Sequence, residues 1–286
     1  MPERLLAVVT GASSGMGAVF ARKLAGRGYD LLLVARREDR LRKLAAEIIS
    51  DCGGSVELLV VDLATDDGRD ALAGRIRTAL NFGLLVNNAG FGTMGMFQQA
   101  DLEPAEQMHR LHVLATLALS HAALRNLAAR SDHAGHTGVI AGKTGVIAGK
   151  TGIINVSSVA AFGQSPTGIC YNATKAWMNS FTEGLAIELA AQGLPVKVQA
   201  LCPGFTYSEF HDRLGMDRGR IPKSMWMTAD FVVEESLRGF DRGALFVIPG
   251  WRYRLLVAFM KATPAWFMQR LSIFAASRFR RTKTSP

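Results

Sequence analysis

Short apolar runs alternate with longer helical patterns along most of this chain, and that alternation restricts the fold more than any other feature. The runs are apolar throughout rather than at every second residue, so both faces of each strand must be covered. Strands are expected over residues 5–10, 30–35, 56–61, 84–87, 152–156, 196–201 and 245–248. Helices are expected between them, over residues 15–27, 38–49, 68–80, 104–129, 171–191 and 229–239.

This order of elements predicts an α/β fold, a doubly wound parallel sheet with helices on both faces. Ligands of such sheets bind beyond the carboxyl ends of the strands, so the residues that follow each strand form the candidate site. We assign residues 1–250 to this single domain and residues 251–286 to a C-terminal extension.

The first strand runs into Thr-Gly-Ala-Ser-Ser-Gly-Met-Gly, residues 10–17. Glycines at positions 11, 15 and 17 allow a tight turn and let a pyrophosphate approach the start of a helix, where unpaired N–H groups favour anions. A tight strand-to-helix turn with no ligand is the alternative. The position after the first strand of a βαβ unit favours the nucleotide site.

Two arginines, Arg36 and Arg37, follow the second strand. A ribose with a free 2′-hydroxyl usually meets a carboxylate at this position, whereas a 2′-phosphate meets arginine. The sequence therefore favours NADP(H) over NAD(H), with a solvated basic helix start as the alternative. Asp62 and Leu63 end the third strand and offer a carboxylate to an adenine amino group. Asn87-Asn-Ala-Gly90 ends the fourth strand, where small residues and amides suit the adenosine half.

Tyr171 and Lys175 lie four residues apart on an expected helix and so share one face of it. An ammonium group beside a phenol favours the phenolate and would lower the tyrosine pKa towards neutral pH. Ser158 ends the fifth strand, where its hydroxyl can polarise a substrate carbonyl. A surface Tyr–Lys pair is the alternative, but the serine at the same edge of the sheet argues for a catalytic group.

In this order and spacing, the motifs resemble those of the short-chain dehydrogenase/reductase family, in its ketoreductase-like, NADP-preferring branch. The matching motifs are TGASSGMG, the Asp-Leu pair at 62–63, NNAG, NVSS, YNATK and Pro203-Gly204, and they cover residues 5–250. The resemblance implies a Rossmann-like fold with Tyr171 as general acid/base and Ser158 as carbonyl polariser. It also implies that Lys175 binds the nicotinamide ribose and lowers the pKa of the tyrosine.

Further roles follow from the same resemblance. Arg36 stands where NADP-preferring members carry a basic residue, and the segment from Pro203 to Thr206 matches the one that lies against the nicotinamide. The residues expected to bind the cofactor are Gly11, Ser13, Ser14, Gly15, Met16, Gly17, Arg36, Arg37, Asp62, Leu63, Asn88, Ala89, Gly90, Tyr171, Lys175, Pro203, Gly204 and Thr206.

His112 departs from the family pattern, because an asparagine usually stands at this position and helps to hold a water that links the lysine to solvent. A histidine could keep this proton relay with a different pH dependence, which would make His112 a fourth catalytic residue. It could equally be satisfied within the helix packing. The sequence leaves both open.

These features predict an oxidoreductase that interconverts an apolar ketone, acyl, lipid-like or steroid-like, and a secondary alcohol. NADP(H) is the expected cofactor and NAD(H) the second choice. The alternative is a cofactor-binding regulatory or scaffold protein with little turnover. Three scattered cysteines and the lack of an export signal favour the cytoplasm and give no metal site. We expect a homodimer or homotetramer.

The net charge of +9 is concentrated after Asp241, where nine cations and no acidic residue follow. The neutral body before it provides no basic groove for nucleic acid. Within residues 251–286, Leu256, Phe259 and Met260 have helical spacing, and so do Phe267, Leu271 and Phe274. Two short basic amphipathic helices are expected. They either pack over the substrate cleft or a partner subunit, or lie peripherally on an anionic membrane.

Residues 137–150 repeat the unit Thr-Gly-Val-Ile-Ala-Gly-Lys. Each copy resembles the end of a phosphate-binding loop, but only three residues separate its glycines, whereas that loop needs four. We therefore interpret the repeat as a tandem insertion that enters the fifth strand from its amino end, away from the ligand edge. A nucleoside triphosphatase is the rejected alternative.

Overall fold

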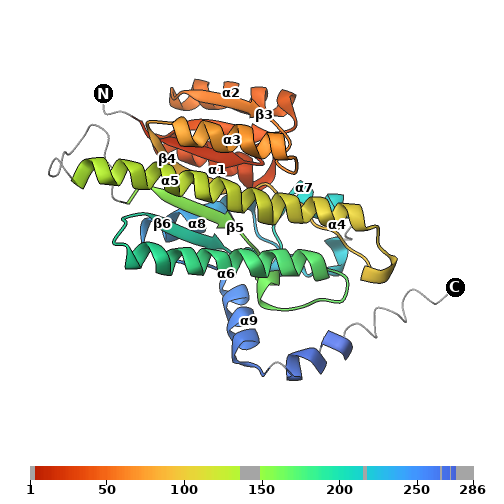
Figure 1. Ribbon diagram of the computed structural model, residues 1–286. Helices are drawn as coiled ribbons and strands as arrows, with labels where there is room; N and C mark the ends of the chain where they lie inside the picture. Colours follow the sequence, from red (N-terminus) through yellow and green to blue (C-terminus); the bar gives the residue numbers. More distant parts are fainter. Residues whose placement is uncertain (1–3, 136–148, 215–217, 265, 271, 275–286) are drawn as a thin grey trace.

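A seven-stranded parallel sheet lies between two layers of helices in the computed structural model, which describes residues 4–135, 149–214, 218–264, 266–270 and 272–274 (Figure 1). The strands are β1 (Leu6–Thr10), β2 (Asp30–Ala35), β3 (Val56–Val60), β4 (Phe82–Asn87), β5 (Gly152–Val156), β6 (Lys197–Leu201) and β7 (Phe246–Val247). Their order is β3-β2-β1-β4-β5-β6-β7, and each neighbouring pair is parallel. The predicted doubly wound, Rossmann-like sheet is confirmed.

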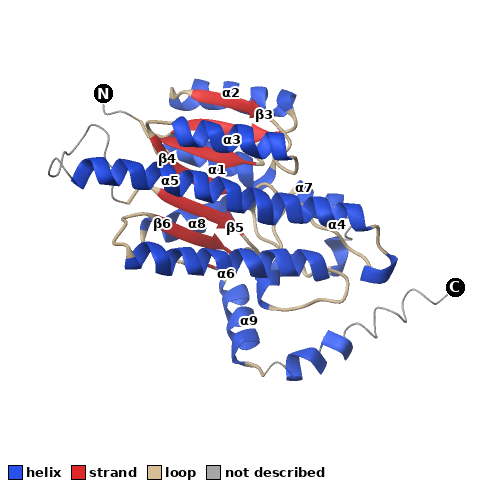
Figure 2. Cartoon of the chain, viewed as in Figure 1, coloured by secondary structure: helices blue, strands red, loops and turns tan. Residues whose placement is uncertain are grey.

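The helices follow the strands as expected, with their ends shifted by a few residues (Figure 2). They are α1 (Gly15–Gly26), α2 (Glu38–Cys52), α3 (Asp66–Thr78), α4 (Leu102–His109), α5 (Thr116–Gly135), α6 (Ile169–Ala191), α7 (Glu209–Arg213), α8 (Ala229–Asp241) and α9 (Trp251–Ala262). Short 3-10 turns cover Phe97–Gln99, Val159–Phe162, Arg218–Arg220 and Lys223–Met225. Among the described helices, none is both long and apolar enough to cross a membrane.

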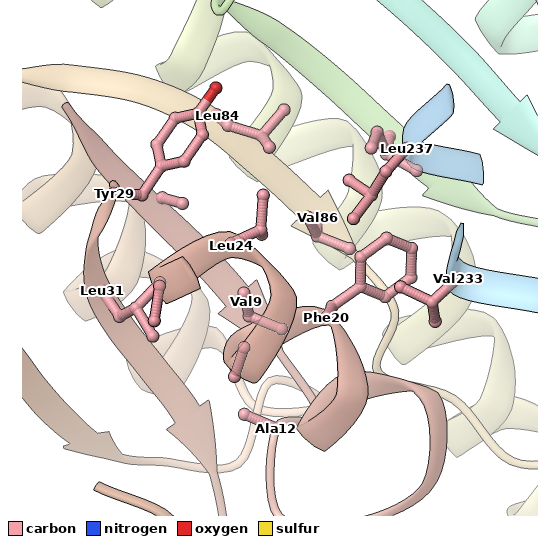
Figure 3. Close-up of a cluster of buried hydrophobic side chains, with 14 of the residues drawn as sticks. Val9, Ala12, Phe20, Leu24, Tyr29, Leu31, Leu84, Val86, Val233 and Leu237 are labelled. Carbon is pink, nitrogen blue, oxygen red and sulfur yellow. The ribbon is translucent and has the colours of Figure 1, made fainter. Parts of the chain in front are cut away.

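Alternate residues of the same strands supply two separate apolar clusters, one on each face of the sheet. Val9 and Val86 point to the face that α1 and α8 cover, where they join Phe20, Leu24 and Leu237 (Figure 3). The residues next to them in the strands, such as Val8 and Leu85, join side chains of α3 and α5 on the other face. Because both faces are buried, the strands need apolar residues at every position, which explains the unbroken runs in the sequence.

The helix expected over residues 104–129 is interrupted by a wider turn. After α4 ends at His109, residues Arg110–Ala115 form a π-helical turn, and α5 begins at Thr116. Such turns are rare and often stand at functional sites. His112 lies in this turn and is fully buried.

The repeat at residues 137–150 lies almost wholly outside the described residues. Its last two residues, Gly149 and Lys150, lie just before the amino end of β5, with Thr151 between them and the strand, as expected. The hydroxyl of Tyr29 donates a hydrogen bond of 2.7 Å to the carbonyl oxygen of Lys150 and so fixes this entry to the strand.

Candidate active site

A single cavity of about 810 Å³ lies at the carboxyl ends of the strands. Loops that follow β1, β2, β3, β4, β5 and β6 all line it, as does α7. Of the residues predicted to form the site, every one except Gly17 lines this cavity. The topology therefore brings together segments that stand almost two hundred residues apart in the chain, such as Gly11 and Thr206.

The glycine loop after β1 packs so closely that side chains would not fit. Gly11 has φ of 66°, and a Cβ on it would lie 2.9 Å from the Cα of Ala89. Gly17 lies beneath the loop, where a Cβ would come within 2.3 Å of the Gly11 carbonyl oxygen. Thr10, which sequence reasoning did not select, joins this loop to the next, because its hydroxyl accepts from the N–H groups of Asn88 and Ala89 at 2.9 and 3.0 Å.

Arg37 lies beside the glycine loop and holds it from the outside. Its guanidinium donates to the hydroxyl of Ser13 at 2.9 and 3.1 Å and to the hydroxyl of Ser14 at 2.7 Å. It also pairs at 2.9 Å with Glu209, the first residue of α7, and Arg40 pairs with the same carboxylate. Hydrogen bonds from Arg40 and Arg37 lower the pKa of Glu209 to about 2.

Arg36 and Asp62 form the outer rim of this end of the cavity. Their side chains pair at 3.3 Å, and the arginine is 64% exposed. The second carboxylate oxygen of Asp62 accepts from the N–H of Ala64 at 2.9 Å, which fixes the turn after β3. Both side chains line the cavity, and the exposed arginine is accessible to an anionic ligand.

At the opposite end, α6 carries Tyr171 and Lys175 on adjacent turns, with the lysine nitrogen 5.7 Å from the centre of the tyrosine ring. The lysine is buried, and its ammonium group donates to the carbonyl oxygen of Val156 at the end of β5, at 2.7 Å. Ser158 follows two residues later and is buried as well. Its hydroxyl accepts from the N–H of Ala160 at 3.1 Å and donates to the carbonyl oxygen of Pro203 at 3.5 Å.

Burial determines the charge of these groups. It raises the pKa of Tyr171 to about 12, and a hydrogen bond from Ser158 opposes the shift without reversing it. Burial also lowers the pKa of Lys175 to about 7. The expected lowering of the tyrosine pKa by Lys175 is thus wrong for the protein alone, because desolvation weakens the lysine's own positive charge and disfavours the phenolate.

His112 is held by protein groups on both sides of its ring. Its Nε2 accepts from the N–H of Phe91 at 3.2 Å, so the proton of the neutral ring lies on Nδ1. Nδ1 then donates at 2.9 Å to the hydroxyl of Thr174, which itself donates to the carbonyl oxygen of Tyr171 at 2.8 Å. Burial, and then the positive charge of Lys175, holds the pKa of His112 well below its usual value. A part in proton transfer stays a prediction.

The wall near Tyr171 is apolar and comes from segments whose role the sequence did not specify. The ring of Phe210 in α7 lies 5.5 Å from that of Tyr171, centre to centre. Other apolar side chains on this wall are Leu214, Leu256, Met260 and Met268. Leu256 and Met260 belong to α9, so one side of this helix packs against the cavity.

One hydroxyl anchors α9 to the cavity. Tyr253 accepts from the N–H of Phe205 at 2.9 Å and donates to the carbonyl oxygen of Met225 at 2.7 Å. Its ring packs on Gly204, where a Cβ would lie 2.0 Å from the ring. The glycine of the Pro203-Gly204 pair is therefore needed for this contact between the loop after β6 and α9.

Residues 5–219 match the short chain dehydrogenase family, and with this fold and site the chain belongs to that family of oxidoreductases. It is similar to a solved short-chain dehydrogenase from Sphingobium yanoikuyae in complex with NADPH, with 33% identity, a TM-score of 0.75, and coverage of 91% of this chain and 97% of the other. It is also similar to a bulky-bulky ketone specific alcohol dehydrogenase from Comamonas testosteroni, at 26% identity and a TM-score of 0.70, covering 100% and 95%. A 7beta-hydroxysteroid dehydrogenase from Collinsella aerofaciens is 27% identical over 245 residues, which is 86% of each chain.

Proposed function

We propose that this protein is an NADP(H)-dependent reductase of bulky, apolar ketones. The observation that carries the proposal is the convergence of Ser158, Tyr171 and Lys175 in the cavity that also contains the glycine loop and its arginines. The polar groups stand at one end of the cavity and the nucleotide-type loop at the other. A dinucleotide and a small organic substrate would fill a cavity of this size.

The residues present fit a nicotinamide dinucleotide. Gly11 and Gly15 line the cavity and carry no side chain, so the backbone of the loop is accessible there to a pyrophosphate at the start of α1. Ser14 occupies the N-cap position of α1, yet its side chain makes no hydrogen bond to the first turn, which also lacks acidic residues. The N–H groups of that turn are then available to an anion.

Arg36 and Arg37 support a preference for NADP(H). A 2′-phosphate suits guanidinium and hydroxyl groups, and Arg37 stands here with Ser13 and Ser14. No carboxylate directly follows β2, where one would bind a free 2′-hydroxyl, and Arg36 stands there instead. The relative from Sphingobium yanoikuyae was solved with NADPH.

The raised pKa of Tyr171 supports the direction of reduction. A phenol with a pKa of about 12 is protonated at neutral pH and can give its proton to a carbonyl oxygen. When bound, the cofactor supplies the hydride. Ser158 lines the same cavity, and its hydroxyl can donate to the same oxygen and stabilise the negative charge that develops there. Lys175, fixed by the carbonyl of Val156, keeps further N–H groups to bind a ribose hydroxyl.

The cavity wall supports a bulky, apolar substrate. The ring of Phe210 lies 5.5 Å from that of Tyr171, and the apolar side chains of Leu214, Leu256, Met260 and Met268 line the same cavity. Apolar contact area, rather than polar recognition, would then hold the ketone in place. Two relatives act, by their names, on bulky-bulky ketones and on hydroxysteroids.

The test is consumption of NADPH across a panel of ketones that ranges from acetone to steroid ketones. We expect turnover to rise with apolar bulk and to be lost in Tyr171→Phe, which should still bind NADPH. A binding or scaffold protein would instead bind NADPH and turn over no ketone faster than Tyr171→Phe does. That result would overturn the proposed activity.

A further inference from the structure

Large apolar side chains are exposed along the C-terminal segment. We call them the outer face, and they are Trp251, Leu255, Phe259, Trp266, Phe267, Ile273 and Phe274. Each is between 45% and 68% exposed. An exposed apolar surface of this kind marks an interaction site more often than chance.

Helix α9 has two distinct sides. Tyr253 and Val257 are buried, and with Met260 they pack against the body of the protein and the cavity. Trp251, Leu255 and Phe259 recur every four residues and form a stripe on the opposite side. Packing over the cavity accounts for the first side and leaves the second without a partner. In Figure 1, α9 projects below the layers of the sheet. The three side chains of the stripe are between 53% and 62% exposed.

Cations border the stripe on both sides. With 3.6 residues per turn, Arg252 lies beside one edge of the stripe, and Arg254 and Lys261 lie beside the other. Arg252 stacks over Trp251 at 4.6 Å, and Arg270 stacks over Trp266 at 5.8 Å.

Two of these cations also contact the body of the protein. Arg254 pairs with Glu235 at 3.3 Å, and Lys261 lies over the rings of Phe162 and Phe246. Four more cations follow in the sequence between residues 278 and 283, and no acidic residue follows Asp241. The segment as a whole is therefore strongly positive.

We propose that the outer face docks on the surface of an anionic lipid bilayer. Tryptophan, leucine and phenylalanine flanked by arginine and lysine suit the boundary between headgroups and acyl chains. Each cation near an anionic surface adds electrostatic attraction. A second copy of this chain is the less suitable partner, because a two-fold contact would place these cations against one another with no carboxylate from the segment between them.

The first test is flotation of the full-length protein with vesicles, which needs no turnover and so stands apart from the proposed reaction. We expect the protein to float with phosphatidylcholine vesicles that contain about a third phosphatidylserine. Binding should fall at least about tenfold with pure phosphatidylcholine, or when salt is raised to screen the charges. Failure to float with anionic vesicles, or equal binding to both kinds, would overturn the proposal.

The second test replaces the stripe. The triple variant Trp251→Ser, Leu255→Ser and Phe259→Ser leaves Tyr253 and Val257 in place, and we expect its partition onto anionic vesicles to fall at least about tenfold. The matched control removes three exposed apolar side chains elsewhere, with Ile49→Ser, Leu80→Ser and Ile187→Ser, and should float like the wild type. Thermal unfolding and NADPH binding report whether each variant is folded.

Size-exclusion chromatography tests the rival partner. If the wild type forms a larger species that the stripe variant loses, and neither floats, then a second copy covers the outer face and the membrane proposal is wrong. If the stripe variant does not fold, the comparison of vesicle compositions on the wild type still decides the question.

Discussion

The two ends of the cavity carry positive charge in opposite ways. At the nucleotide end, Arg36 is largely exposed and Arg37 is 28% exposed, and Arg40 and Arg37 lower the pKa of the neighbouring Glu209 carboxyl to about 2. At the other end, Lys175 is buried against a neutral carbonyl and its pKa falls to about 7. On the proposed function, the cofactor would therefore be bound by arginines that stay charged at every physiological pH. Proton transfer would instead involve groups whose pKa values burial has shifted.

Removal of the Tyr171 hydroxyl should give the largest difference between the effect on turnover and the effect on NADPH binding. We expect Tyr171→Phe to lower kcat by about 10²- to 10⁴-fold, because the proton donor is lost, while the Kd for NADPH changes by less than about threefold. Single-turnover kinetics and fluorescence titration with NADPH measure the two quantities. Loss of NADPH binding to the same extent as turnover would show that binding and proton transfer do not depend on different ends of the cavity.

Substitutions at the nucleotide end should weaken NADPH binding without affecting the groups that transfer protons. Because a charge-assisted hydrogen bond contributes about 1.5–3 kcal/mol, Arg37→Ala should raise the KM for NADPH about 10- to 100-fold, and Arg36→Ala should raise it less. The KM for NADH should stay close to that of the wild type. Arg22→Ala removes an exposed arginine that pairs with Glu47 on the surface, and serves as the control. A wild-type preference for NADH that Arg36→Ala leaves unchanged would contradict the assignment.

The buried lysine should leave a signature in stability against pH. Its pKa is 10.5 in the unfolded chain and about 7 in the fold, so between these values the unfolded state binds the extra proton. Stability from this site therefore rises from pH 7 to pH 9, by up to about 1.4 kcal/mol per pH unit. Denaturant unfolding at pH 7, 8 and 9 should show a shallower rise in Lys175→Met than in the wild type. Equal slopes would mean that the lysine is solvated.

A substitution of His112 tests whether its hydrogen bonds to Phe91 and Thr174 stabilise the end of the cavity that contains Tyr171 and Lys175. An asparagine cannot bind both Phe91 and Thr174 as the ring does, so His112→Asn should lower the free energy of unfolding by about 1–3 kcal/mol at pH 7. The folded pKa is depressed, so the wild type loses stability as the pH falls below 6.5, and the variant should lose less. A shifted pH profile of kcat with unchanged stability would instead support the proton relay.

The smallest effect is expected at the amino end of the sheet. Excising residues 137–150 should change the free energy of unfolding by less than about 1 kcal/mol and leave NADPH binding and turnover as they are. The carbonyl that accepts from Tyr29 belongs to the residue before Thr151, and His136 can supply it after the deletion. A folded deletion variant that no longer binds NADPH would contradict the insertion hypothesis.

Much of this molecule could be predicted because its signals are local. The strands buried on both faces leave unbroken apolar runs, and the glycine loop and the Tyr171–Lys175 pair each fall within a few residues. The π-helical turn around His112 could not be predicted, because one wide turn does not disturb a period of 3.6 over a long helix. The same holds for α7, whose five residues are too short for a pattern, although it brings Glu209 and Phe210 to the cavity.

The direction of the tyrosine shift was out of reach for a different reason. Sequence spacing gives the field of Lys175 on Tyr171, but the cost of desolvating both groups depends on what covers them. That cover comes from segments distant in the chain, among them the loop after β6 and α7. Pair geometry can be predicted from two residues, whereas burial requires the whole fold.

The hydroxyl of Tyr253 has a consequence for where this chain can be cut. Composition changes at residue 250, yet packing continues through Tyr253 and Val257, and the tyrosine connects the backbones at Phe205 and Met225. A chain ended at residue 250 would lose the ring that covers Gly204 and leave the N–H of Phe205 without its acceptor. Helix α9 therefore supports the loop after β6 that lines the cavity, and a shortened form of this protein should end no earlier than Thr263.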